Sequence, residues 1–175
     1  MELVDVYNER HEKLNYTKER QTLIEEEYKL SCFVWVINDN DKILLQQRSS
    51  TVKQLPNMWG ATAGCAQAGE TSLDGTLREL KEELGIDATR EEMVFIGSYK
   101  RINDFVEIWL CKKNIDIKEL ILDPTEVQSA QWFSIDEFEK MIIDGIGIDS
   151  GFEIFKNYYN RYYEITEEKP VTIKN

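Results

Sequence analysis

The sequence predicts an α/β protein that forms one domain, and two features of its pattern support this prediction. Segments rich in β-branched and aromatic residues occur in pairs around short polar turns, which is typical of β-hairpins. Between and after these pairs, apolar residues recur every three to four positions, which is typical of helices that pack on a sheet. A length of 175 residues suits one hydrophobic core, so we expect residues 1–175 to form a single domain.

The expected strands and helices follow one another in a definite order. After a short edge strand, a turn and a charged connector, the residues from Leu30 to Ile37 form a continuous apolar run, as in a strand buried on both faces. Including that segment, strands are expected at 3–7, 30–37, 42–48, 59–66, 93–101, 105–112, 118–122 and 129–133. Helices are expected at 71–84, at 134–143 behind the cap Ser134, and at about 152–164.

Composition and charge exclude several classes of function. The chain has 33 acidic and 21 basic residues, a net charge of −12 and no basic block, whereas duplex nucleic acid binding needs clustered Lys and Arg. Its three cysteines include no CxxC pair, and His11 is the single histidine, which excludes a disulfide framework, a zinc knuckle and any two-histidine mechanism. No apolar run suits a membrane span or a signal peptide, so we expect a cytoplasmic protein without a membrane partner.

The helix expected at 71–84 has two faces of opposite character. Its leucines recur at i, i+4, i+7 and i+11 and form one stripe that can pack on a sheet. The members of this stripe are Leu73, Leu77, Leu80 and Leu84. On another side, Glu79, Glu82 and Glu83 crowd together, which destabilises a bare helix unless a cation such as Mg²⁺ neutralises the charge. Taken alone, three glutamates are more often a solvated acidic face than a metal site.

The wider spacing around these glutamates favours the metal site. Gly64 is followed after five residues by Glu70, and after seven more by Arg78-Glu79-Leu80-Lys81-Glu82-Glu83-Leu84-Gly85-Ile86. This run over 64–86 matches the Nudix box, and the sequence therefore resembles the Nudix hydrolase family. A chance match of its seven fixed identities has a probability near ~10⁻⁸ per start position at average residue usage.

The resemblance extends beyond the box. The segment 30–48, Pro56-Asn57-Met58-Trp59 and Gln131-Trp132-Phe133 are also similar to the family, so the family-like core covers about 30–140. The N-terminal run Val4-Asp5-Val6-Tyr7 resembles the subgroup that contains the isopentenyl diphosphate isomerases. The resemblance implies a mixed β-sheet between helices, to which this chain adds a C-terminal helix. It also allows a homodimer, in which the aromatic stripe of that helix is a candidate contact.

The resemblance implies an activity and a cofactor. Family members hydrolyse a diphosphate bond in a nucleoside diphosphate linked to another moiety, or in a related small-molecule diphosphate, with Mg²⁺ or Mn²⁺. The resemblance implies that Glu79, Glu82, Glu83 and the backbone carbonyl of Gly64 are metal ligands. It also implies that Arg78 orients the neighbouring glutamates.

Three assignments stay open at this point. Glu70 either supports the metal or caps the helix. The general base is Glu79 or Glu126, and we favour Glu79 as both ligand and base. Arg48 and Lys53 are the candidate phosphate contacts, and Lys100 and Arg101 are weaker ones.

Two other functions compete with hydrolysis. An isopentenyl diphosphate isomerase has a catalytic cysteine just before the box glycine, a metal-binding histidine just after it and another at the first buried strand. Ala63, Cys65 and Lys29 occupy these positions here, which argues against isomerisation. A non-catalytic Nudix-fold nucleotide-binding domain is the second alternative, but such proteins usually lose box glutamates and this chain keeps them.

Overall fold

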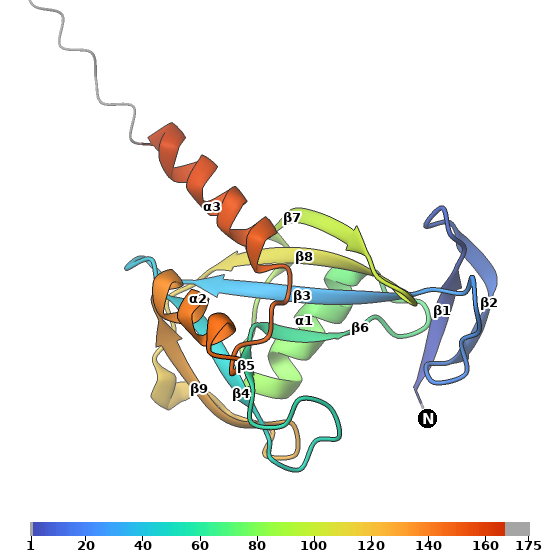
Figure 1. The fold of residues 1–175 in the computed structure, drawn as a ribbon, viewed down its shortest axis with the longest axis horizontal. Helices are drawn as coiled ribbons and strands as arrows, with labels where there is room; N and C mark the ends of the chain where they lie inside the picture. The colour runs from blue at the N-terminus through green and yellow to red at the C-terminus, as the bar shows by residue number, and fades with distance from the viewer. Residues whose placement is uncertain (1, 167–175) are drawn as a thin grey trace, which may run out of the picture.

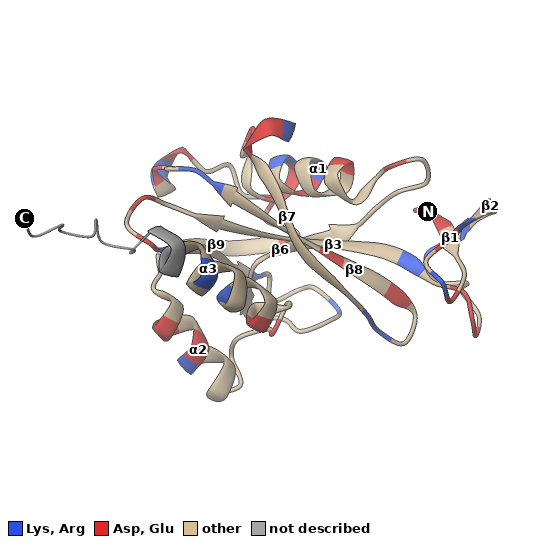
Figure 2. Ribbon diagram, turned by 90° about the horizontal axis from the view of Figure 1, so that it is seen from above, with Lys and Arg blue, Asp and Glu red and all other residues tan. Residues whose placement is uncertain are grey.

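The computed structural model describes residues 2–166 as a mixed β-sheet with helices on both faces (Figures 1 and 2). The strands are β1 (Leu3–Tyr7), β2 (Lys13–Glu19), β3 (Lys29–Ile37), β4 (Ile43–Arg48), β5 (Trp59–Gly60), β6 (Thr62–Cys65), β7 (Met93–Lys100), β8 (Asp104–Lys112) and β9 (Val127–Phe133). The helices are α1 (Ser72–Leu84), α2 (Ile135–Ile143) and α3 (Phe152–Thr166). The expected fold class, including the added C-terminal helix, is confirmed.

The centre of the molecule is β3, which is buried along all nine of its residues. It runs parallel to β8, from Lys29 opposite Asp104 to Ile37 opposite Lys112, and antiparallel to β4 and β6. The main sheet has the order β5-β4-β3-β8-β7, while β6 pairs with β3 and β9 with β4. A strand covered on both faces favours apolar side chains on both, which explains the nearly continuous apolar run, and the buried Lys29 and Ser31 are paired with Asp104.

The two faces of β3 belong to two cores. Trp35 and its neighbours on one face pack against Phe138 of α2 and Phe155 of α3. Val34 and Val36, on the other face, pack with Leu80 and Leu84 of α1. Figure 2 shows α1 on one side of the sheet and α2 and α3 on the other. No helix of residues 2–166 has the length and apolar character needed to cross a membrane.

The N-terminal segment differs from the sequence-based expectation. The residues expected to form a charged connector include β2, which pairs antiparallel with β1 as a separate two-stranded sheet. The side chains of β2 are mostly exposed and polar, so its sequence lacks the apolar alternation by which strands are recognised. Backbone pairing with β1 keeps β2 in an ordered conformation. The hairpin of β1 and β2 is attached through Val4 and Val6, which are completely buried.

Two further strand predictions need correction. The strand expected at 118–122 is wrong, because Ile117–Glu119 forms a short 3₁₀ turn, in which the side chain of Asp116 accepts the N–H of Lys118. The single strand expected at 59–66 is divided, because β5 pairs with β4 whereas β6 pairs with β3. This division brings β6, which contains Gly64, against the central strand and under α1.

Candidate active site

Helix α1 presents the acidic cluster from a well-defined position. Thr71 caps its N-terminus and exchanges hydrogen bonds with Asp74, and Gly85 ends it with φ of 70°, the left-handed conformation that glycine adopts without strain. Leu80 and Leu84 are buried, and Leu73 and Leu77 pack beside them, so the expected leucine stripe is confirmed. The stripe fixes the rotation of α1 and turns Glu79 and Glu83 towards β6 and β4.

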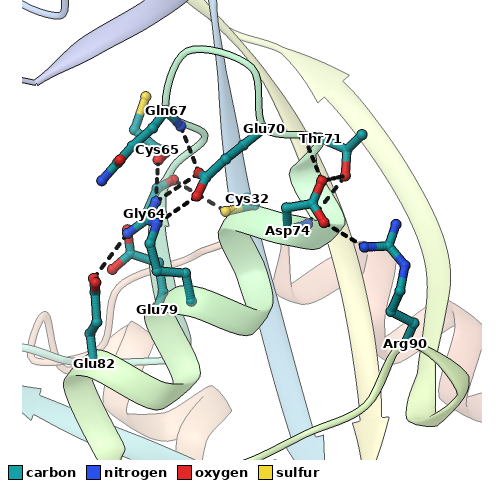
Figure 3. Close-up of polar contacts among 11 residues, drawn as sticks. Cys32, Gly64, Cys65, Gln67, Glu70, Thr71, Asp74, Glu79, Glu82 and Arg90 are labelled. Carbon is teal, nitrogen blue, oxygen red and sulfur yellow. Dashed lines mark hydrogen bonds and ion pairs between the residues drawn. The ribbon is translucent and has the colours of Figure 1, made fainter.

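Gly64 and Glu79 lie in very close contact (Figure 3). A Cβ atom added at Gly64 would lie 2.0 Å from Oε1 of Glu79, a distance at which two atoms cannot coexist. Glycine is therefore required on β6 for the Glu79 side chain to keep this position. Gly64 pairs with Cys32 in the ladder between β3 and β6, and its carbonyl oxygen also lies 3.7 Å from Sγ of Cys32. A carbonyl oxygen has two lone pairs, so it retains acceptor capacity beside a ladder bond.

Arg78 holds three carboxylates of the site in fixed positions. Its Nε and Nη2 donate to the two oxygens of Glu70 at 2.9 and 3.1 Å, and Nη2 also donates to the carbonyl of Cys65 at 2.9 Å. Its Nη1 donates to Glu79 at 2.8 Å and to Glu82 at 3.0 Å. Figure 3 shows Glu70, Glu79 and Glu82 converging on one region from the loop and the helix. The arrangement agrees with the orienting role that the resemblance implies for Arg78.

Glu70 does not cap α1, because Thr71 is the N-cap residue. Both of its oxygens are engaged by Arg78, and Oε2 also accepts the backbone N–H of Gln67 at 2.8 Å. Burial raises the pKa of this carboxyl, but the hydrogen bonds from Arg78 and Gln67 outweigh burial and hold the pKa below its usual value. Glu70 is thus an ionised partner that positions Arg78.

The three box glutamates differ in exposure. Glu83 is 6% exposed and accepts a hydrogen bond at 2.6 Å from Nε2 of Gln46 on β4, whose Oε1 in turn accepts from the hydroxyl of Thr62 at 3.2 Å. The side chain of Glu82 is 58% exposed, and that of Glu79 is 14% exposed. Burial raises the pKa of Glu83 to about 8 and also raises that of Glu79. The sequence pattern does not distinguish the three glutamates. In the structure the sheet covers Glu79 and Glu83, whereas Glu82 is exposed.

A cavity of about 360 Å³ lies against this helix face, and we call it the box cavity. Its lining includes most of the expected site residues: Arg48, Gly64, Arg78, Glu79, Glu82, Glu83 and Glu126. Glu70 lies behind Arg78 and does not line it, and Lys53 is exposed on its loop and does not line it either. The structure thus brings together residues from β4, β6, α1 and the loop before β9.

The donor chemistry of the box cavity suits a hard divalent cation. Carboxylate and carbonyl oxygens are the ligands that Mg²⁺ prefers, and Glu83 has only an amide as its hydrogen-bond partner. Within residues 2–166, however, no three acidic, cysteine or histidine side chains converge on one point as a preformed site. Among the described residues, Arg78 donates to one oxygen of Glu79 and to one oxygen of Glu82, which leaves the second oxygen of each carboxylate for an ion.

A second cavity, of about 190 Å³, adjoins the first and shares Arg20, Arg48, Ala63 and Gly64 with it. We call it the arginine cavity, because Arg20, Arg48 and Arg101 line it and none of the described residues in its lining is acidic. Sequence reasoning missed Arg20 and Gln46. Gln46 could have been found, because the alternation of β4 places it on the same face as Arg48. The sequence did not indicate a role for Arg20, because β2, the strand that precedes it, was not predicted.

The comparisons with known proteins agree with this geometry. A family model described as NUDIX domain matches residues 27–147. An uncharacterised Nudix hydrolase of Listeria monocytogenes is 32% identical over 149 residues, which cover 83% of this chain and 87% of the relative. Another, of Clostridium acetobutylicum, is 31% identical and covers 95% of this chain and 86% of its own length.

One solved structure is similar over nearly its whole length. The crystal structure of a Deinococcus radiodurans protein has a TM-score of 0.73 and 18% identity, and the match covers 89% of this chain and 98% of that one. At this identity the similarity shows the fold alone. None of these relatives supports the isomerase-like subgroup suggested by the N-terminal run. The match to residues 27–147, together with the two relatives, shows that the chain belongs to the NUDIX domain family and is a Nudix hydrolase.

Proposed function

We propose that this Nudix hydrolase cleaves a diphosphate bond in a small-molecule substrate, with Mg²⁺ or Mn²⁺ held by Glu79, Glu82, Glu83 and the carbonyl of Gly64. The observation that supports this most is the contact between Gly64 and Glu79, which places the Gly64 backbone beside the carboxylates of α1 in the lining of one cavity. When bound there, a divalent ion neutralises phosphoryl oxygens and makes a bound water more acidic.

The remaining residues have supporting roles in this proposal. Arg78 and Glu70 keep Glu79 and Glu82 at the cavity, and Gln46 keeps Glu83 there. Glu79 is the favoured general base, because it is enclosed beside Gly64, whereas Glu126 is exposed on its loop and is the alternative. Both line the box cavity, so either could reach a water molecule in it.

Arg48 is the proposed phosphate contact of this site. Its Nε donates to the carbonyl of Gln54 at 3.0 Å, and among the described residues it has no acidic partner within ion-pair distance. An arginine without a carboxylate partner, on the wall shared by both cavities, is available to a phosphoryl group. Lys53 is exposed and lines neither cavity, so it is the weaker of the two phosphate contacts expected from the sequence. The homodimer and the cytoplasmic location stay predictions.

Isomerisation is less well supported than hydrolysis. Ala63 has no nucleophile, and Cys65 is buried, donates to the carbonyl of Leu30 at 3.3 Å and has a pKa raised to about 11 by burial. Lys29 pairs with Asp104 at 3.6 Å. Its side chain lies on the face of β3 opposite to the one that packs on α1, the helix that carries the box glutamates. A nucleotide-binding domain without turnover remains the second alternative, and the same experiment tests it.

The test is a screen for phosphate release and for mass-spectrometric products over a panel of diphosphates. The panel contains nucleoside triphosphates, nucleotide sugars, ADP-ribose, dinucleoside polyphosphates, coenzyme A and isopentenyl diphosphate, each with Mg²⁺ or Mn²⁺ and with EDTA. We expect cleavage of one class that is lost with EDTA and in Glu83→Gln. Glu91→Gln, which changes an exposed glutamate outside both cavities, is the matched control. No turnover by folded, metal-loaded protein would favour the binding domain.

A further inference from the structure

Arg20 reaches the active site from outside the matched family region. It follows β2 directly, whereas the NUDIX match covers residues 27–147. Its side chain lines both the box cavity and the arginine cavity. The N-terminal hairpin therefore contributes a cation to the place where the two cavities meet.

The hairpin is fixed to the loop that leads into α1. The backbone N–H of Ala68 donates to the carbonyl of Leu3 at 2.9 Å, and that of Gly69 donates to Oδ2 of Asp5 at 2.8 Å. Residues 67–70 form the loop whose Glu70 holds Arg78. Because the hairpin and this loop are bonded together, the position of Arg20 is tied to that of the box glutamates.

The two lysines of β2 have close structural partners, whereas the ion pair of Arg20 is longer and more exposed. Lys13 pairs with Asp5 and Lys18 with Glu27, each at 2.6 Å, and both acids are nearly buried. Arg20 has one ion pair, with Glu2 at 3.4 Å, and both side chains are partly exposed. Such an exposed pair contributes little to folding, so the stability of the hairpin does not explain an arginine at this position.

The charge around Arg20 suits an anion. The box cavity is rich in carboxylates, whereas the arginine cavity has Arg20, Arg48 and Arg101 and, among its described lining residues, no acid. Arg101 is already engaged by the buried Asp104, which leaves Arg20 and Arg48 as the cations available to a ligand. Guanidinium groups bind phosphoryl oxygens through paired N–H donors.

We propose that Arg20 binds a phosphoryl group of the substrate together with Arg48, where the two cavities meet, and so makes the N-terminal hairpin part of the substrate site. The assignment rests on the proposed diphosphate hydrolysis. In this arrangement the two arginines hold the phosphoryl group that extends from the carboxylate cluster into the arginine cavity.

The experiment compares Arg20→Gln, Arg20→Lys and the control Arg10→Gln, which removes one positive charge from the exposed turn of the same hairpin. KM and kcat are measured on the best substrate of the panel, and the Kd of methylenediphosphonate with Mg²⁺ is measured by calorimetry. Loss of a charge-assisted hydrogen bond predicts that Arg20→Gln raises KM and this Kd about tenfold or more, with kcat much less affected. Arg20→Lys should recover part of the affinity, and Arg10→Gln should match the wild type.

Two results would overturn the assignment of Arg20. One is an unchanged KM and methylenediphosphonate Kd in Arg20→Gln. The other is a lower unfolding midpoint in Arg20→Gln without any change in that Kd, which would make the role of Arg20 structural. If the wild type hydrolyses nothing in the panel, the proposed function fails, while the calorimetric Kd still decides whether Arg20 binds the diphosphonate.

Discussion

Nε2 of Gln46 lies 2.6 Å from Oε2 of Glu83, and this hydrogen bond joins strand β4 to the last turn of helix α1. Both side chains are buried, and the amide of Gln46 is a neutral donor to this carboxylate. The amide fixes the orientation of Glu83 towards the box cavity. Gln46 thus stands behind a proposed metal ligand, where outer-shell partners commonly determine affinity.

Replacement of Gln46 by Leu should weaken metal binding and leave the fold intact. We expect the Mg²⁺ concentration for half-maximal activity to rise about 10- to 100-fold, as for other outer-shell partners of metal ligands. Activity titrated with Mg²⁺ measures this, and Gln128→Leu, a change of an exposed glutamine on β9, is the control. An unchanged Mg²⁺ requirement would show that Gln46 does not support a metal ligand.

Replacement of Gly64 by Ala should abolish turnover, because the new Cβ would displace the carboxylate of Glu79 from β6. Metal-dependent activity and the thermal unfolding midpoint are measured together. The expected result is a loss of activity that is much larger than any loss of folded protein at assay temperature. Full activity in this variant would contradict the close contact of Gly64 with Glu79.

Replacement of Leu80 by Ala should destabilise the protein by roughly 2–5 kcal/mol, the usual cost of truncating a buried leucine. Leu80 is completely buried in the core between α1 and β3, whereas Leu77 of the same stripe is only partly buried. Leu77→Ala should therefore cost less, and the pair is compared by urea unfolding. Equal costs for the two variants would show that the burial of the stripe is misassigned.

The buried carboxylate of Asp104 should make stability depend on pH in the acid range. Burial raises its pKa, but hydrogen bonds from Arg101 and Ser31, with Lys29 nearby, outweigh burial and hold the pKa below its usual value. Because the folded-state pKa is depressed, the stabilisation is complete above the unfolded value of about 3.9 and is lost as the pH falls through the lower folded value.

Urea unfolding of the wild type and Asp104→Asn at pH 7 and at several values below pH 4 tests this expectation. The difference in unfolding free energy between the two proteins should be largest at pH 7 and should shrink as the solution becomes more acidic. Asp144→Asn, at an exposed aspartate after α2, serves as the control and should show no such convergence. A constant difference for Asp104→Asn would contradict the assigned pairing.

What the sequence could predict was local. The rotation of α1 follows from the spacing of its leucines. The grouping of Gly64, Arg78 and Glu79 was implied by the resemblance of a stretch of about twenty residues to the Nudix box, and the structure places them together. The burial of Glu83 depends on β4, and no pattern within α1 reports which side chain of another strand lies opposite. Strand β2 was missed for a related reason, because backbone pairing orders it and its polar side chains leave no periodicity. Arg20 was missed with it.

The parallel pairing of β3 with β8 has a consequence for synthesis. Ser31 and Asp104, joined by a hydrogen bond at 2.6 Å, are 73 positions apart in the chain, so this contact has a high contact order. When the nascent chain has emerged only as far as α1, its most apolar strand, β3, still lacks its neighbour β8. Folding of the domain therefore waits until β8 has left the ribosome, and until then β3 is an exposed edge open to aggregation or chaperone binding.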